Sequence, residues 1–226
     1  MMLAIGLLIQ ATISAANPSP SLAEFQQQIR DAYVAVETAQ SKKPPAKDTS
    51  EQLIRLGERD QAGRSAFQQL DFSQVPESQR TAWRTAIFSE IARHDKVYQG
   101  ELKSLIPAEG WFKLSVYGKD ASRAAFLIVQ HAVEDTKFMK SVLQKMGEFV
   151  RQGEAEGQLY AMMYDRVSLE FDQKPQLYGT QVKCEDGKWG AYNLYEPEKI
   201  DERRKSIGMT QTYQQYLAMF DNSKCL

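Results

Sequence analysis

The chain has 226 residues, with 28 basic and 29 acidic side chains and a formal net charge of −1. A net charge near zero creates no long-range field that attracts nucleic acid or anionic lipid, so neither is expected as a partner. No apolar run reaches the roughly 20 residues that cross a bilayer, and no stable membrane span is expected.

An apolar stretch opens the chain from Met1 to Ile9 and is followed by the small residues Ser14, Ala15 and Ala16. This order is typical of a secretory signal with its cleavage site, although no basic residue precedes the apolar stretch. We therefore expect residues 1–16 to be a signal peptide and the mature protein to be exported, periplasmic or secreted, and free in solution.

The residues after the leader suit a helix from 22 to 40, and Pro44 follows its end, because proline lacks an amide donor and restrains the residue before it. Residues 17–47 are expected to form an N-terminal helix and a Pro/Lys linker. The remaining residues, 48–226, are enough for one domain with a sizeable core. The sequence indicates neither a cofactor nor an oligomeric state.

Apolar side chains recur at three- and four-residue steps through most of the remaining chain. Asp135 is a predicted N-cap, because a short acidic side chain accepts the free amides of a first helical turn. Helices are predicted over residues 50–70, 79–106, 124–133, 136–152, 154–169 and 211–220. The predicted fold class is mainly α, a single-domain helical bundle with a small β-hairpin near the C-terminus.

The hairpin is predicted near residues 177–195, which are rich in aromatic and β-branched side chains. Asp186-Gly187 is a favoured hairpin turn, and a turn at this place pairs Cys184 with Trp189.

Cys184 and Cys225 are the two cysteines of the chain. In an oxidising compartment they could form a disulfide, and closing a loop of about 40 residues contributes about 3–4 kcal/mol on the chain-entropy model. Two unpaired thiols fit the sequence equally well.

Ionisable residues interrupt several of the apolar stripes. They are Asp60, His94 or Asp95, His131, Asp165 and Arg166. An unpaired buried charge costs several kcal/mol, so such groups must be paired, neutral or in contact with a water-filled pocket. A shared polar cavity accounts for all of them together, while separate structural pairs, such as Asp60 with Arg64 four residues later, remain open.

Standard catalytic motifs are absent from the sequence, and the spacing of its two histidines does not indicate a metal site. The block at residues 175–181 and the Gln130-His131-Ala132 triplet are the most specific of several short motifs. The full set is Gly110-Trp111, Leu127 with Gln130-His131-Ala132 and Asp135, Ala161 with Asp165-Arg166-Val167, Pro175-Gln176-Leu177-Tyr178-Gly179-Thr180-Gln181, and Asp201-Glu202-Arg203-Arg204 with Gly208 and Tyr216. Their order and spacing resemble the bacterial domain-of-unknown-function 6624 family over roughly residues 95–217.

The resemblance implies no activity, because that family has none assigned. It implies that His131, Asp165 and Arg166, which interrupt the stripes, also belong to the family pattern. This chain departs from the pattern at two places. Tyr98 stands where an Asn is expected. An Asp usually comes soon after Gln-His-Ala, whereas here Val133 and Glu134 intervene before Asp135.

The first functional hypothesis is a small-ligand pocket between the central helices and the hairpin. The expected ligand-binding residues are Trp111, Gln130, Arg166, Gln176, Tyr178, Thr180, Gln181, Arg203 and Arg204. If the pocket is catalytic, hydrolysis is the simplest reaction, with His131 as general base and Asp135 or Asp165 orienting it. An anionic group of the substrate would then be held by Arg166 or Arg203. The alternative is a non-enzymatic exported interaction or structural module, in which the polar groups form an internal network.

Overall fold

The computed structural model describes residues 20–186 and 188–220. Its main helices and strands, in chain order, are α1 (Leu22–Ser41), α2 (Thr49–Gln69), α3 (Glu77–Leu105), α4 (Leu114–Tyr117), α5 (Lys119–Gln130), α6 (Thr136–Val150), α7 (Gly157–Glu170), β1 (Val182–Glu185), β2 (Lys188–Ala191), α8 (Ile200–Ser206) and α9 (Tyr213–Ala218). The prediction of a mainly α fold with a small hairpin near the C-terminus is confirmed.

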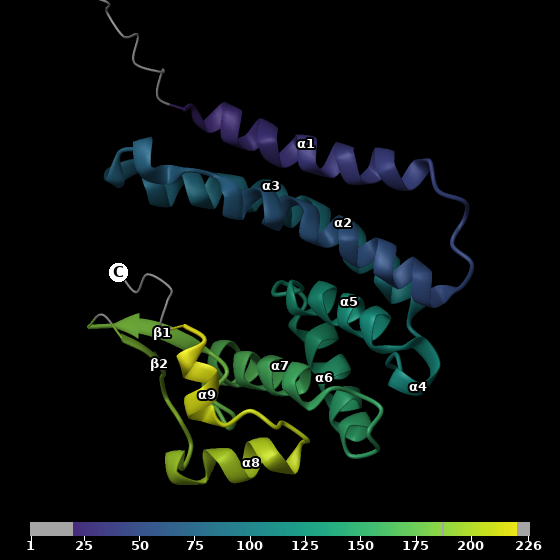
Figure 1. The fold of residues 1–226 in the computed structure, drawn as a ribbon, viewed down its shortest axis with the longest axis vertical. Helices are drawn as coiled ribbons and strands as arrows, with labels where there is room; N and C mark the ends of the chain where they lie inside the picture. The colour runs from purple at the N-terminus through teal and green to yellow at the C-terminus, as the bar shows by residue number, and fades with distance from the viewer. Residues whose placement is uncertain (1–19, 187, 221–226) are drawn as a thin grey trace, which may run out of the picture.

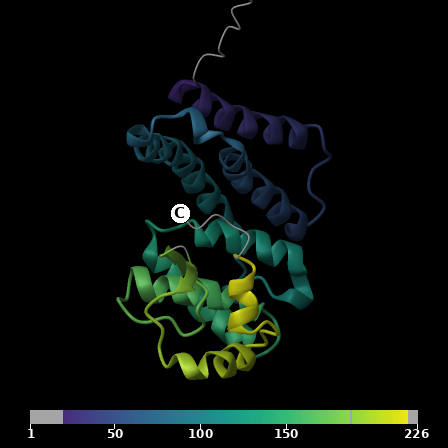
Figure 2. The same cartoon turned by 60° about the vertical axis from the view of Figure 1, so that its left-hand side comes forward.

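The three long helices α1, α2 and α3 lie side by side and alternate in direction (Figures 1 and 2). Helix α5 packs against α2 and joins this layer to the other half of the molecule, which contains α6 to α9 and the hairpin. The end of α5 therefore lies at the junction of the two halves, and this junction carries the candidate site.

Helix α1 begins with a capping box, in which the Ser21 hydroxyl accepts the Glu24 amide and the Glu24 carboxylate accepts the Ser21 amide. Its apolar residues Phe25, Ile29 and Tyr33 recur every four residues and are buried. They belong to the same hydrophobic core as the later helices, so α1 packs as a part of the bundle.

Close contact between α2 and α5 depends on Gly57. A Cβ atom at Gly57 would lie 2.7 Å from the Cβ of Ala124, so a side chain there would push the two helices apart. His131 follows Ala124 by seven residues, about two helical turns. The close contact thus brings the end of α5 to α2.

The hairpin has the predicted register, with Cys184 opposite Trp189 and Val182 opposite Ala191. Its first strand begins at Val182, five residues later than the predicted segment. The reason is that backbone amides between residues 177 and 180 donate to the Asp165 side chain rather than to a neighbouring strand. Gly187 of the predicted turn lies outside the described residues.

Two helix boundaries differ clearly from the sequence prediction. Helix α5 starts at Lys119 rather than at 124, directly after Gly118 with φ 78°, and it ends at Gln130 rather than at 133. Residues 201–205, which belong to none of the predicted helices, lie in α8, whose first turn is acidic and whose last turn is basic. This order of charges complements the helix dipole, which stabilises a short helix without an apolar stripe.

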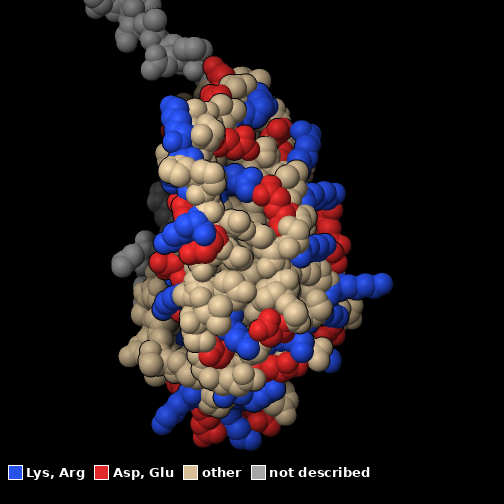
Figure 3. Space-filling model, turned by 90° about the vertical axis from the view of Figure 1, so that its right-hand side faces the viewer, with Lys and Arg blue, Asp and Glu red and all other residues tan. Residues whose placement is uncertain are grey.

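Among the described residues, no helix has the length and hydrophobicity needed to span a membrane. On the face shown in Figure 3, basic and acidic side chains are interspersed, without a broad area of one sign. The predicted signal peptide, residues 1–16, and Cys225 lie outside the described residues, so the signal and the disulfide stay predictions.

Candidate functional site

Three helices bring ionisable side chains to one place, which we call the His131 cluster: Asp60 and Arg64 from α2, Asp95 from α3, and His131 at the end of α5. Asp60 and Asp95 each occupy a step of the buried stripe of their helix. Helical periodicity therefore turns both carboxylates inward, where α2, α3 and α5 pack together.

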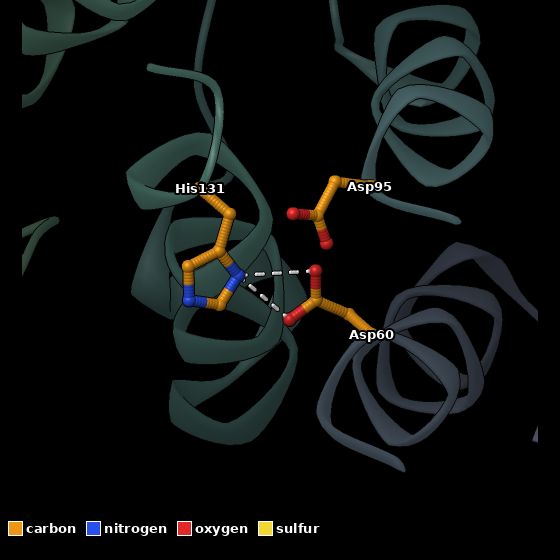
Figure 4. Close-up of side chains that lie close together, drawn as sticks. All are labelled: Asp60, Asp95 and His131. Atoms are coloured by element: carbon orange, nitrogen blue, oxygen red, sulfur yellow. Dashed lines mark hydrogen bonds and ion pairs between the residues drawn. The ribbon is translucent and has the colours of Figure 1, made fainter. Parts of the chain in front are cut away.

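The imidazole of His131 is bound to Asp60 (Figure 4). Its Nδ1 atom lies 2.9 Å from Oδ2 and 3.1 Å from Oδ1 of Asp60. The Asp60 side chain is 0% exposed, whereas the His131 side chain is 14% exposed. An ionised carboxylate only accepts hydrogen bonds, so this contact favours the tautomer with the proton on Nδ1. Nε2 has no hydrogen-bond partner among the described residues and points away from both carboxylates (Figure 4).

Arg64 and Asp95 form the second pair of the cluster. The guanidinium binds Asp95 with two parallel hydrogen bonds of 2.8 Å, a geometry that combines charge with fixed orientation. Arg64 Nη1 also lies 3.8 Å from Oδ1 of Asp60. The Gln61 side-chain amide donates to Asp60 over 2.7 Å. Each carboxylate thus has a basic partner, which offsets the cost of burying it.

Two aromatic residues border the cluster. Tyr33 of α1 is buried, its hydroxyl has no hydrogen-bond partner among the described residues, and its ring stacks on His94 with centroids 3.6 Å apart. Burial and then the negative charge of Asp95 raise the pKa of Tyr33 well above its ordinary value. Burial also raises the pKa of Tyr98 to about 12. Both phenols therefore stay neutral at physiological pH.

The cluster offers three ligand atoms to a divalent cation, because atoms of Asp60, Asp95 and His131 that can bind a metal lie within 4.8 Å of one another. However, both oxygens of Asp95 bind Arg64, and Nδ1 of His131 faces Asp60. A cation would have to displace the guanidinium and break the imidazole contact. His94, the second histidine, stacks on Tyr33 instead of joining the group. The arrangement fits an acid–base pair better than a metal centre.

Gln130 and Arg166 lie beside His131. Arg166 Nη1 donates to the backbone carbonyl of Gln130 over 3.0 Å, which ties α7 to the last turn of α5. The Gln130 Oε1 atom and the Arg166 Nε atom are buried without a hydrogen-bond partner among the described residues. Unsatisfied buried polar atoms are costly, so they mark a place where a bound polar group adds stability.

Asp135, one of the two carboxylates expected to orient His131, has another role. Its side chain accepts the Phe138 amide as the N-cap of α6 and binds Lys103 over 2.7 Å. Lys103 and this amide together lower the pKa of Asp135. The predicted cap is thus observed, and the carboxylate that contacts His131 is Asp60.

Asp165, the other expected partner of His131, lies in a separate network. One carboxylate oxygen accepts the amides of Leu177 and Tyr178, and the other accepts the amide and the hydroxyl of Thr180, over 2.9–3.1 Å. The side chain is completely buried. Burial raises the pKa of Asp165, and the four donors oppose this shift because they stabilise the carboxylate.

Two glutamines continue this network, which we call the Asp165 network. Buried Gln176 accepts the Gln181 amide over 2.9 Å and donates to the carbonyls of Gln181 and Tyr192. The Gln181 side chain donates to the Met162 carbonyl of α7. Both side chains therefore bind backbone groups and hold the segment before β1 against α7.

Two arginines complete the Asp165 network. Arg203 donates to the Leu177 carbonyl over 2.7 Å, and Arg204 donates to the Tyr178 carbonyl over 2.8 Å. Arg204 is buried, and desolvation lowers its pKa. The ring of Tyr178 packs among tyrosines of α7 rather than facing a cavity.

Trp111 is 1% exposed, and its indole N–H has no partner among the described residues. It lies in the main hydrophobic core. Its position is that of a core side chain, apart from the cluster and the network.

The structure thus divides the expected site residues into two groups. His131, Gln130 and Arg166 meet at the end of α5, whereas Asp165, Gln176, Tyr178, Thr180, Gln181, Arg203 and Arg204 hold the C-terminal segments together. The stripe interruptions pointed to Asp60 and Asp95 but did not show that both meet His131. Tyr33 was missed; its only sequence signal is its four-residue spacing from Ile29.

The fold and this site define a helical protein with a partly buried acid–base cluster between two layers. Residues 47–226 match the model of a family of unknown function, DUF6624. The chain belongs to that family, so the resemblance seen in the motifs is confirmed. No curated protein and no solved structure matches it.

Proposed function

We propose that the protein is an exported hydrolase of a small polar substrate, with His131 as its general base and Asp60 orienting the imidazole. The supporting observation is the contact between Nδ1 and the buried Asp60 carboxylate, which leaves Nε2 without a partner from the described residues. A histidine held through one nitrogen by a carboxylate is suited to taking up a proton at the other.

In the proposed reaction, Nε2 takes a proton from a water molecule while the water oxygen attacks the carbonyl or phosphoryl centre. The imidazolium then returns the proton to the leaving group as its bond to that centre breaks. Asp60 stabilises the transient positive charge of the imidazolium. Arg64 neutralises Asp95, so a single negative charge remains opposite His131.

Arg166 and Gln130 are proposed to position the substrate. Their unsatisfied Nε and Oε1 atoms lie on residues that are hydrogen-bonded to each other, and Gln130 directly precedes His131 in the chain. A guanidinium favours a carboxylate or phosphate, so the substrate is expected to carry an anionic group. The exposed carboxylate of Glu170 lies 3.7 Å from Arg166 Nε. An anionic group of the substrate would displace it from the guanidinium.

The test is a panel of carboxylic esters, amides and phosphoesters, assayed with wild type, His131→Gln and His94→Gln. Loss of a general base typically reduces the rate by about 10²–10⁴-fold, so His131→Gln should lose hydrolysis. His94→Gln is the matched control, because it removes the other histidine of the chain outside the cluster. Equal rates in wild type and His131→Gln across the panel would refute the proposal.

Export is proposed from the leader alone. The apolar residues 1–9 and the small residues at 14–16 support cleavage after Ala16. N-terminal sequencing of protein expressed with the full leader should find a chain that starts at Asn17. A chain that keeps its leader and stays with the cytoplasm would contradict export.

A non-enzymatic structural module is the second candidate, and the Asp165 network favours it. Most polar side chains of that network bind backbone groups within the chain, which is what an internal scaffold requires. This candidate predicts that His131→Gln lowers stability without changing hydrolysis of any substrate in the panel.

A further inference from the structure

A groove lies at the other end of α5 from His131. The start of α5, the turn between α6 and α7, residues 206–211 and α9 surround it. Its volume is about 920 Å³, compared with about 420 Å³ for a surface hollow on α3. Lys119 and Arg123, which line the groove, precede His131 by twelve and eight residues, about 18 Å and about 12 Å along the axis of α5. The groove is therefore separate from the His131 cluster.

One side of the groove is cationic. Lys119, Arg123 and Arg151 line it, against one carboxylate, that of Glu156. Lys119 binds Glu156 over 2.6 Å, whereas Arg123 and Arg151 make no ion pair with any residue of the described chain. Both guanidiniums are exposed. The groove thus carries two positive charges that no acidic side chain of the described part neutralises.

The groove also has an apolar part. Met162, Met209, Tyr216 and Met219 line it, and Met219 is 67% exposed. Methionine side chains are flexible and adapt to irregular apolar ligands. Exposed apolar surface beside fixed positive charge is the pattern that an amphiphile with an anionic head group complements.

We propose that this groove binds a single-chain amphiphile with an anionic head group, a carboxylate or a phosphate. Arg123 and Arg151 hold the head group, and the chain lies along Met162, Met209 and Met219. The volume of the groove is within the range of about 300–1,000 Å³ that is usual for small-molecule sites. The proposal does not depend on hydrolysis at His131.

Calorimetric titration with dodecanoate and with dodecyl phosphate, each below its critical micelle concentration, tests the proposal. Dodecyl maltoside, which has the same chain and a neutral head, is the comparison ligand. We expect one molecule of at least one anionic amphiphile to bind per chain, at least tenfold more tightly than the maltoside. Whichever anion binds identifies the head group.

The variant Arg123→Ala/Arg151→Ala should weaken binding at least tenfold. Its matched control, Arg30→Ala/Arg93→Ala, removes the same charge from α1 and α3 outside the groove and should stay within twofold of wild type. Met219→Ser, at an exposed position, should weaken binding of the amphiphile without lowering the melting temperature. No binding of either anion, equal binding by the Arg123/Arg151 variant, or equal binding of the maltoside would overturn the proposal.

Discussion

Two buried carboxylates, Asp60 and Asp165, illustrate how differently an acid can be accommodated in this core. Asp165 accepts four donors from one loop and fixes that loop on α7. Asp60 faces a histidine that is partly exposed and has a free nitrogen. A fully satisfied acid stabilises a fold, whereas an acid that orients a free base also provides chemistry.

Asp165→Ala should destabilise the protein strongly. It leaves three amides without their acceptor, and one such orphaned group costs about 1–3 kcal/mol where it is buried. We expect the free energy of unfolding in urea to fall by about 3 kcal/mol or more. Asp165→Asn keeps one acceptor oxygen and should lose less. A loss below about 1 kcal/mol in the Ala variant would be inconsistent with this network.

At the scale of single elements, α6 depends on its N-cap. Asp135→Ala removes the acceptor of the Phe138 amide and the partner of Lys103, and loss of a cap usually costs about 0.5–2 kcal/mol. Asp135→Asn keeps a capping oxygen and should be milder. Thermal unfolding of the three proteins measures the difference.

The contribution that the negative charge of Asp135 makes to the free energy of unfolding should be lost in acid. The pKa of Asp135 is lowered in the folded protein from its ordinary value of 3.8, so the contribution is present above that value and is lost as pH falls through the folded pKa. The stability difference between wild type and Asp135→Asn should therefore shrink below about pH 3.8. A difference that grows in acid would mean that Asp135 is not stabilised as an anion.

Local patterns predicted the helices well because periodicity, caps and prolines act within a few residues. The first strand was predicted too long because Asp165, at least 12 residues earlier, takes the amides of residues 177–180. The helix α8 was missed because its stability comes from the order of its charges rather than from an apolar stripe. Long-range contacts and short charged helices are what local patterns leave out.

At the scale of the whole molecule, the family match begins at residue 47, yet α1 precedes it and fills part of the core. A chain that starts at Lys47 loses Phe25, Ile29 and Tyr33, and burial of one such side chain is worth about 1.5–3 kcal/mol. We expect its melting temperature to fall well below that of a chain starting at Asn17. An unchanged melting temperature would show that α1 is dispensable.

The convergence of His131 with Asp60 could not be predicted from the sequence. The stripe interruptions identified both residues, but they are 71 positions apart, and their contact depends on the close approach of α2 and α5 at Gly57. Asp135 is closer to His131 in the sequence, and Asp165 belongs to the same family pattern, so these two carboxylates were the expected partners of His131. Packing of whole helices, rather than spacing along the chain, selects the partner.

The central claim is that Asp60 holds His131 with Nε2 as the free base. Long-range ¹H–¹⁵N correlation spectroscopy of the two histidines, with His94→Gln to assign them, measures the tautomer of the neutral imidazole directly. We predict that neutral His131 carries its proton on Nδ1 and that this preference is lost in Asp60→Asn. A proton on Nε2 in the wild type, or the same mixture of tautomers in both proteins, would contradict the account.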